Sequence, residues 1–196
     1  MGLYLNPNAD AFQMGLNTEI YVDKSLILSE LNKLVSSQGN FVCLSRPRRF
    51  GKSMAGNMIS AYYSKGCDTR EVFSQMKLGQ EPGFDKYLNK FNVIKLDLNG
   101  WYQNAIVEKS VVSLIEEINK SLLVDFRKQF PGIVFEEKSS LARCVKEVYA
   151  ETGEKFVIII DEYDVLIREQ VPQSLFDSYL SFLNGLFKDT AIRPAI

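Results

Sequence analysis

Three runs of consecutive apolar residues stand out along the chain, and elsewhere apolar residues recur at helical spacing. Residues 156–160 read Phe-Val-Ile-Ile-Ile, residues 92–99 contain Val-Ile-Lys-Leu, and residues 41–45 form a third run of similar length. Each run has the length of a β-strand. Continuous apolar strands are typical of a parallel sheet covered on both faces. The pattern therefore predicts an α/β fold, a mostly parallel sheet with helices on both faces.

The spacing of three or four residues between apolar positions predicts the helices. They are expected at 24–37, from about 53 to 66, 105–129, 139–151 and 173–188, with short helices at 71–76 and 84–88. Asp23 is expected to cap the first of them, and Gly153 to end the helix 139–151. Residues 1–22 are predicted as an N-terminal lead-in and residues 23–196 as one domain.

The segment after the run 41–45 has the features of a phosphate-binding loop. It ends in Gly51-Lys52-Ser53 and opens into a predicted helix, so loop N–H groups and the helix dipole face an anion. In such a loop the lysine neutralises the β and γ phosphates and the serine hydroxyl ligates Mg²⁺. The predicted nucleotide-binding residues are Arg46, Pro47, Arg48, Arg49, Phe50, Gly51, Lys52 and Ser53. The alternative is an ordinary strand–turn–helix with a chance Gly-Lys-Ser, because the general pattern has glycine where Arg46 stands.

A pair of acids follows the apolar run 156–160. Ligands of open α/β sheets bind beyond the carboxyl ends of the strands, which is where Asp161 and Glu162 are expected. Asp161 is predicted to hold Mg²⁺ together with Ser53. Glu162 is predicted to orient and deprotonate the attacking water, and Lys52 and Glu162 are the predicted catalytic residues. The alternative is a strand that ends in solvated acids.

Composition excludes several classes of protein. The chain has 196 residues, of which 46% are hydrophobic and 24% charged, as in a globular domain with one core. A net charge of −1 gives no indication of nucleic-acid binding. The absence of histidine excludes His-based zinc sites and Ser–His or Cys–His nucleophiles. Three scattered cysteines, no signal peptide and no apolar run of membrane-spanning length predict a cytoplasmic protein with reduced thiols.

Three further positions remain open between a site role and a structural one. Asp97, near the end of its strand, is as well explained by Mg²⁺ or water binding as by a solvated strand end. Asp164 is better explained as a helix cap than as a catalytic group. Trp101 and the tyrosine after it are more often core residues than a platform for a nucleotide base.

The quoted residues resemble a family of bacterial AAA-ATPase-like P-loop NTPases. The matching segments are Tyr-Val-Asp-Lys-Ser at 21–25, Leu-Ser-Arg-Pro-Arg-Arg-Phe-Gly-Lys-Ser at 44–53 and Ile-Ile-Ile-Asp-Glu-Tyr-Asp at 158–164. In that family arginine stands at the position of Arg46. The resemblance implies a P-loop NTPase fold with ATP and Mg²⁺ as cofactors. It also implies a further strand after the positions of residues 191–192, so the domain 23–196 is expected to lack its last strand or strands.

The resulting hypothesis is an ATP-binding domain that hydrolyses ATP with Mg²⁺ and drives a conformational change in a larger protein. The alternative is a switch or scaffold module that binds nucleotide without hydrolysing it. ATP hydrolysis is expected in the full-length family context, and whether this chain is itself an enzyme is left open. ATP rather than GTP rests on the resemblance alone. The expected partners are the nucleotide and the C-terminal PD-(D/E)XK nuclease-like domain that members of the family often carry. No membrane partner is expected, and an oligomer is left open.

Overall fold

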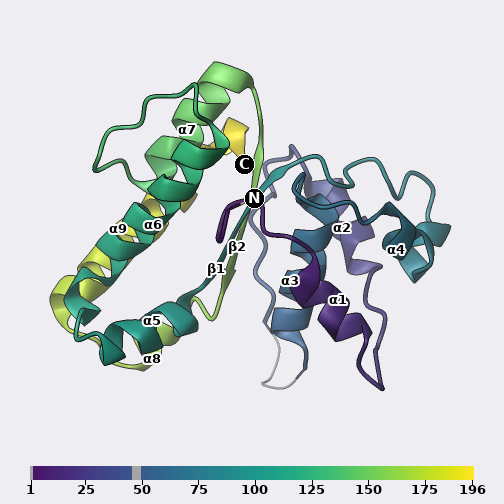
Figure 1. Cartoon of the computed structure of the whole chain (residues 1–196), viewed down its shortest axis with the longest axis horizontal. Coiled ribbons are helices and arrows are strands. Elements are labelled where there is room, and N and C mark those ends of the chain that lie inside the picture. The colour runs from purple at the N-terminus through teal and green to yellow at the C-terminus, as the bar shows by residue number, and fades with distance from the viewer. Residues whose placement is uncertain (1, 46–49) are drawn as a thin grey trace.

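A small parallel sheet lies at the centre of the fold, with helices on either side of it (Figure 1). The structure, a computed structural model, describes residues 2–45 and 50–196. Within those residues the sheet has two strands, β1 (Asn92–Asp97) and β2 (Phe156–Asp161). They run parallel, in a register that starts with Asn92 beside Phe156 and ends with Asp97 beside Asp161. This small parallel sheet among helices is compatible with the predicted α/β class.

Alternate residues of each strand enter two separate cores. Ile94 and Leu96 of β1 lie in one core, and Val93 lies in the other. On β2, Ile158 and Ile160 pack against the first core, whereas Val157 and Ile159 pack against the second. Because successive side chains of a strand point to opposite faces, this division means that helices cover both faces.

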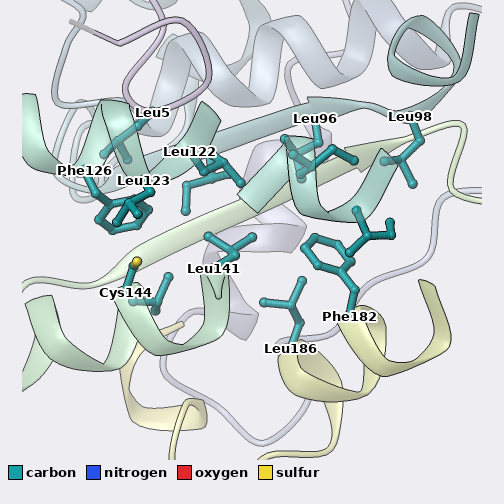
Figure 2. Close-up of a cluster of buried hydrophobic side chains, with 14 of the residues drawn as sticks. Leu5, Leu96, Leu98, Leu122, Leu123, Phe126, Leu141, Cys144, Phe182 and Leu186 are labelled. Atoms are coloured by element: carbon teal, nitrogen blue, oxygen red, sulfur yellow. The ribbon is translucent and has the colours of Figure 1, made fainter. Parts of the chain in front are cut away.

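The first core lies between the sheet and the C-terminal helices. These are α5 (Leu98–Val107), α6 (Leu114–Gln129), α7 (Leu141–Thr152), α8 (Val165–Arg168) and α9 (Gln173–Phe187), with short 3₁₀ turns at Val111–Ser113 and Arg193–Ala195. Figure 2 shows Leu96 and Leu98 in one cluster with Leu122, Leu141 and Leu186, which come from three of these helices. All five side chains are almost completely buried.

The second core lies on the opposite face of the sheet. It is formed by α1 (Asp10–Leu16), α2 (Ile27–Leu34), α3 (Lys52–Tyr63), α4 (Arg70–Ser74) and the 3₁₀ turn Lys77–Gln80. Phe12 of α1 stacks on Phe73 of α4, with ring centroids 5.4 Å apart. Met58 and Tyr62 give α3 a fully buried side, so this helix is fixed between the sheet and α1.

The segment predicted as a lead-in contributes to both cores. Leu5 is fully buried and forms an antiparallel bridge with Ile94. The Asp125 carboxylate accepts hydrogen bonds from the N–H groups of Tyr4 (2.8 Å) and Leu5 (3.2 Å), which ties this segment to α6. Phe12 adds a buried ring on the other face. Residues 2–22 therefore pack as part of the same fold as residues 23–196, whereas the sequence analysis expects them to be a lead-in.

The predicted strand 41–45 is wrong. These residues lie outside the sheet, and Val42 and Leu44 are 47% and 41% exposed. A strand is defined by its hydrogen-bonded ladder, and this segment lies across a cavity from β2 instead of beside it. An apolar run alone does not supply the neighbour that a strand requires.

Several predicted helix bounds are also wrong. The helix predicted at 105–129 is divided, because α5 ends at Val107 and α6 begins at Leu114. Strand β1 ends at Asp97, whose carboxylate accepts the N–H groups of Asn99 and Gly100 and so begins α5. Residues 84–88 form turns, not a helix.

Asp23 does not cap the first predicted helix. The residue before α2 is Leu26, and the Asp23 carboxylate instead accepts the N–H groups of Ser25 at 2.8 Å and Lys77 at 2.7 Å. These bonds fix the segment 21–25 against the 3₁₀ turn Lys77–Gln80.

None of the helices in residues 2–45 and 50–196 combines the length and the apolar character that crossing a membrane would require.

Candidate nucleotide site

The N-terminus of α3 lies at the carboxyl end of β2. Gly51 precedes the helix in the left-handed conformation, with φ of +75°, and Lys52 is the first helical residue. The first N–H groups of a helix have no partner within it, and the helix dipole makes this end attractive to anions. The turn at Gly51 therefore presents an anion-binding helix end next to the sheet edge where ligands of α/β proteins bind.

Lys52 meets Glu162 across this helix end. The Lys52 ammonium lies 3.9 Å from one Glu162 carboxylate oxygen, and the Arg168 guanidinium lies 3.5 Å from the other. Glu162 has φ of +51°, a conformation that costs a residue other than glycine roughly 1 kcal/mol or more. Its own N–H donates to the Asp161 carboxylate at 3.0 Å. The two acids thus lie at the end of β2, where the chain makes an unusual turn at Glu162.

Lys24 reaches the loop from a distant part of the sequence. Its ammonium donates a 2.9 Å hydrogen bond to the carbonyl oxygen of Phe50, and a Cβ atom on Gly51 would lie 3.2 Å from the same ammonium. The positive φ is what favours glycine at position 51, and the approach of Lys24 leaves little room for a side chain there. Sequence reasoning assigned Lys24 no place in the phosphate loop. The signal available was its position in the segment 21–25 that resembles the family.

Two residues of β1 lie beside Asp161. Asp97 is its neighbour in the sheet, and its carboxylate is engaged in capping α5, which favours the structural interpretation of Asp97. Lys95 is half-buried and donates a hydrogen bond to the Asn57 side-chain oxygen on α3. Burial lowers the pKa of Lys95, and the negative charges of Asp161 and Asp97 oppose that change. No pattern in the sequence indicates a role for Lys95.

A cavity of about 610 Å³ opens beside these groups. Lys52, Asp161 and Glu162 line one part of it, and the rest follows the length of β2 and the segment 40–44. The Cys43 sulfur lies 3.8 Å from the Tyr163 hydroxyl within this lining. The candidate site thus has a charged end at α3 and an apolar wall along β2.

The residues predicted to bind Mg²⁺ flank the same end. Ser53 is the second residue of α3 and is exposed, and Asp161 is the last residue of β2. In the described part of the chain, no three cysteine or acidic side chains converge on one point as a metal cluster. A hydroxyl and a carboxylate suit Mg²⁺ where phosphate oxygens and water complete its shell, so these residues fit a metal that arrives with a nucleotide.

The remaining predicted site residues are distributed as follows. Arg46, Pro47, Arg48 and Arg49 lie outside the described residues, and Phe50 is 57% exposed. Asp164 is the residue before α8, but its side chain accepts no hydrogen bond from the N–H groups of that helix; its carboxylate instead lies 3.3 Å from Arg168. Trp101 packs on Tyr4 with ring centroids 5.0 Å apart, next to the first core. Arg168, which holds Glu162, was not predicted.

Comparison with known proteins identifies the family. Residues 11–192 match the family described as Predicted AAA-ATPase, so the chain belongs to this AAA-ATPase-like family, as its sequence indicates. A protein of Azotobacter chroococcum mcd 1, described as "Uncharacterized protein in vnfD 5'region", is 25% identical over 178 residues. The match covers 87% of this chain and 31% of that protein, so the chain spans about a third of the relative's length. No solved structure matches the chain.

Proposed function

We propose that the chain is a P-loop NTPase domain that binds ATP with Mg²⁺ at the N-terminus of α3 and hydrolyses it. The observation that carries the proposal is the meeting of Lys52 and Glu162, which lie far apart in the sequence but 3.9 Å apart in space, at an anion-binding helix end. Membership of a family described as Predicted AAA-ATPase supports ATP as the nucleotide.

Different residues bind the phosphates and the metal in this proposal. Lys52 exchanges its contact with Glu162 for the β and γ phosphates, and the free N–H groups of α3 bind phosphate oxygens. Ser53 and Asp161 supply the oxygen ligands for the metal. Bound Mg²⁺ supplies charge neutralisation on the phosphates during transfer. Lys24 holds the loop through the Phe50 carbonyl, so the N–H groups stay directed at the anion.

Glu162 is the proposed general base for the attacking water. Once Lys52 is engaged by phosphate, the carboxylate keeps one cationic neighbour, Arg168, at 3.5 Å. Arg168 thereby fixes its direction, and the freed oxygen accepts the proton of a water placed in line with the γ phosphate. We further propose that this cycle acts on the rest of a longer protein, since the relative is about three times the length of this chain.

A second candidate function is a module that binds nucleotide without hydrolysis. It is favoured by the same two ion pairs, because a Glu162 held between Lys52 and Arg168 is not available as a base. The two candidates differ in one respect, whether Lys52 releases Glu162 when nucleotide binds.

The experiment measures the thermal stability of the chain with ATP and Mg²⁺ together with phosphate release. Ligand at a hundred times its dissociation constant stabilises the folded state by about 2.7 kcal/mol, which is easily seen as a rise in Tm. Lys52→Met is expected to lose this rise. Lys33→Met, which removes an exposed lysine of α2, is the matched control and should keep it. A rise without phosphate release selects the second candidate, and no rise in the wild type contradicts both.

A further inference from the structure

Lys95 has an unusual position for a lysine. It lies in the middle of β1 between Ile94 and Leu96, both fully buried, and it is itself half-buried. Its ammonium donates a hydrogen bond to Asn57, so the side chain lies on the face of the sheet that α3 covers. Lysine side chains lose hydration in such a place and are seldom found there without an electrostatic partner. The neighbouring charges should therefore explain its presence.

The two predicted metal ligands lie on the two elements that flank this lysine, α3 and β2. Asn57 follows Ser53 by four residues, and residues with this spacing lie one above the other on a helix. On the sheet, Lys95 lies on the same face as Asp97, two residues later, and Asp97 pairs with Asp161. The charges of both carboxylates act on the ammonium. The ammonium thus lies between the sheet and α3, one step deeper than Ser53 and Asp161.

We propose that Lys95 is a positioning cation of the nucleotide site, which offsets the negative charge of Asp161 from within the fold and is held in place by Asn57. The inference rests on the proposed function, because it concerns ATP and Mg²⁺ at that site. A fixed positive charge there favours the triphosphate and opposes a second cation. Lys95 therefore sets how strongly ATP binding depends on Mg²⁺.

Removal of the charge has opposite effects on the two forms of the ligand. Lys95→Met keeps most of the aliphatic side chain and loses the ammonium. Without the ammonium, the negative charge of Asp161 is no longer compensated, so it repels metal-free ATP and that ATP binds more weakly. The Mg²⁺ complex of ATP is affected less, because the uncompensated Asp161 charge attracts the metal. The ratio of the dissociation constant in EDTA to that in Mg²⁺ should rise about tenfold.

Asn57→Ala should move the same ratio in the other direction. Without its hydrogen bond to Asn57, the Lys95 ammonium is free to approach Asp161. The lysine then competes more directly with Mg²⁺ for that carboxylate, and the ratio should fall severalfold. A residue that merely supports the fold would change both dissociation constants by the same factor and leave the ratio as it is.

The test is calorimetric titration of the full chain with ATP, once in Mg²⁺ and once in EDTA. Lys95→Arg keeps the charge and should keep the wild-type ratio. Lys65→Met is the matched control, since it removes a lysine that pairs with Glu154, two residues before β2 and at its opposite end. A Lys95→Met ratio within twofold of wild type overturns the inference, as does an equal rise in Lys65→Met. If Lys95→Met does not fold, the sign of the Asn57→Ala change decides. A wild type that binds ATP in neither buffer overturns the proposed function itself.

Discussion

The Lys52 ammonium lies 3.9 Å from the Glu162 carboxylate, although Lys52 begins α3 and Glu162 follows β2. This contact places the lysine proposed to bind phosphate and the proposed base at one end of the sheet. If the proposed function holds, one contact partner of Lys52 in the free protein is the group that hydrolysis requires. The proposal therefore links nucleotide binding and activation of the base through a single ion pair.

Glu162→Gln should separate binding from turnover. The amide cannot accept the proton of the attacking water, and loss of a general base typically lowers the rate by a factor of about a hundred or more. ATP affinity should stay within a few fold of wild type, because Lys52 remains. Phosphate release and calorimetric titration measure the two quantities. Glu169→Gln, which removes another carboxylate that contacts Arg168, is the control and should leave turnover unchanged. Undiminished phosphate release in Glu162→Gln would exclude Glu162 as the base.

Gly51→Ala should weaken both the fold and ATP binding. A non-glycine residue at φ of +75° costs about 1–2 kcal/mol, and the added Cβ would lie 3.2 Å from the Lys24 ammonium. Urea denaturation should show that loss, and titration should show a lower ATP affinity, because the N–H groups of α3 are redirected.

Gly153→Ala is the control that separates the loss of stability from the loss of ATP affinity expected for Gly51→Ala. Gly153 has φ of +70°, and no atom lies within 4 Å of a Cβ built there. It ends α7, at a distance from the phosphate loop along the chain. We expect a similar loss of stability with unchanged ATP affinity. Equal losses of ATP affinity in both variants would show that Gly51 acts only through stability.

Most long, periodic elements were predictable from the sequence, whereas among the short helices only α4, predicted at 71–76, was. Strand β2 and helices α7 and α9 follow apolar patterns that local spacing determines. Helices α1 and α8 have seven and four residues, too few for a periodic signal, and they are stabilised by packing. The run 41–45 was mistaken for a strand because its apolar residues line a cavity instead of the interior of a sheet.

The candidate site was predictable only where a motif marks it. Gly51-Lys52-Ser53 and Asp161-Glu162 have recognisable spacing, and the structure brings Lys52 and Glu162 together, while their roles stay predictions. Lys24 is marked only by its place in the family-like segment 21–25, and Lys95 and Arg168 lie in no recognised site motif. Each reaches the site from another element through folding, as an exposed loop, a strand centre and a short helix. Contacts of this kind cannot be predicted from the spacing of residues in the sequence.

Asp23→Asn should lower stability in a way that depends on pH. Burial raises the pKa of Asp23, but the hydrogen bonds from Lys77 and Ser25 outweigh it and leave the pKa below its usual value. A carboxyl group with a lowered pKa stabilises the fold above the unfolded pKa of about 4 and loses that contribution as pH falls through the folded pKa.

The amide keeps only one acceptor for these two donors, so we expect a loss of about 1 kcal/mol at pH 7. The difference from wild type should shrink below about pH 4, where the wild type itself becomes protonated. Urea denaturation at several pH values measures it. Asp68→Asn, at an exposed position, tests whether the loss comes from the hydrogen bonds or from removing a negative charge. A difference of constant size down to pH 3 would contradict the explanation.

The three cysteines should react with a thiol reagent at distinct rates. Cys43 is exposed and lines the cavity, so it should react first. Burial raises the pKa of the half-buried Cys67 above its usual value, which slows its reaction because the thiolate is the reactive form. Cys144 is 1% exposed, and burial raises its pKa to about 12. It should stay protected until the chain unfolds.

Release of a coloured thiolate from an aromatic disulfide at pH 8 measures these phases. Cys43→Ser should remove the fast phase alone, and Cys144→Ser should leave the kinetics of the folded protein unchanged. Urea should then expose Cys144 in Cys43→Ser, so one further equivalent of coloured thiolate is released. In Cys144→Ser this further equivalent should be missing. If Cys144 reacted as quickly as Cys43 in the folded chain, the packing of α7 against the first core would have to be wrong, since Cys144 lies within that core.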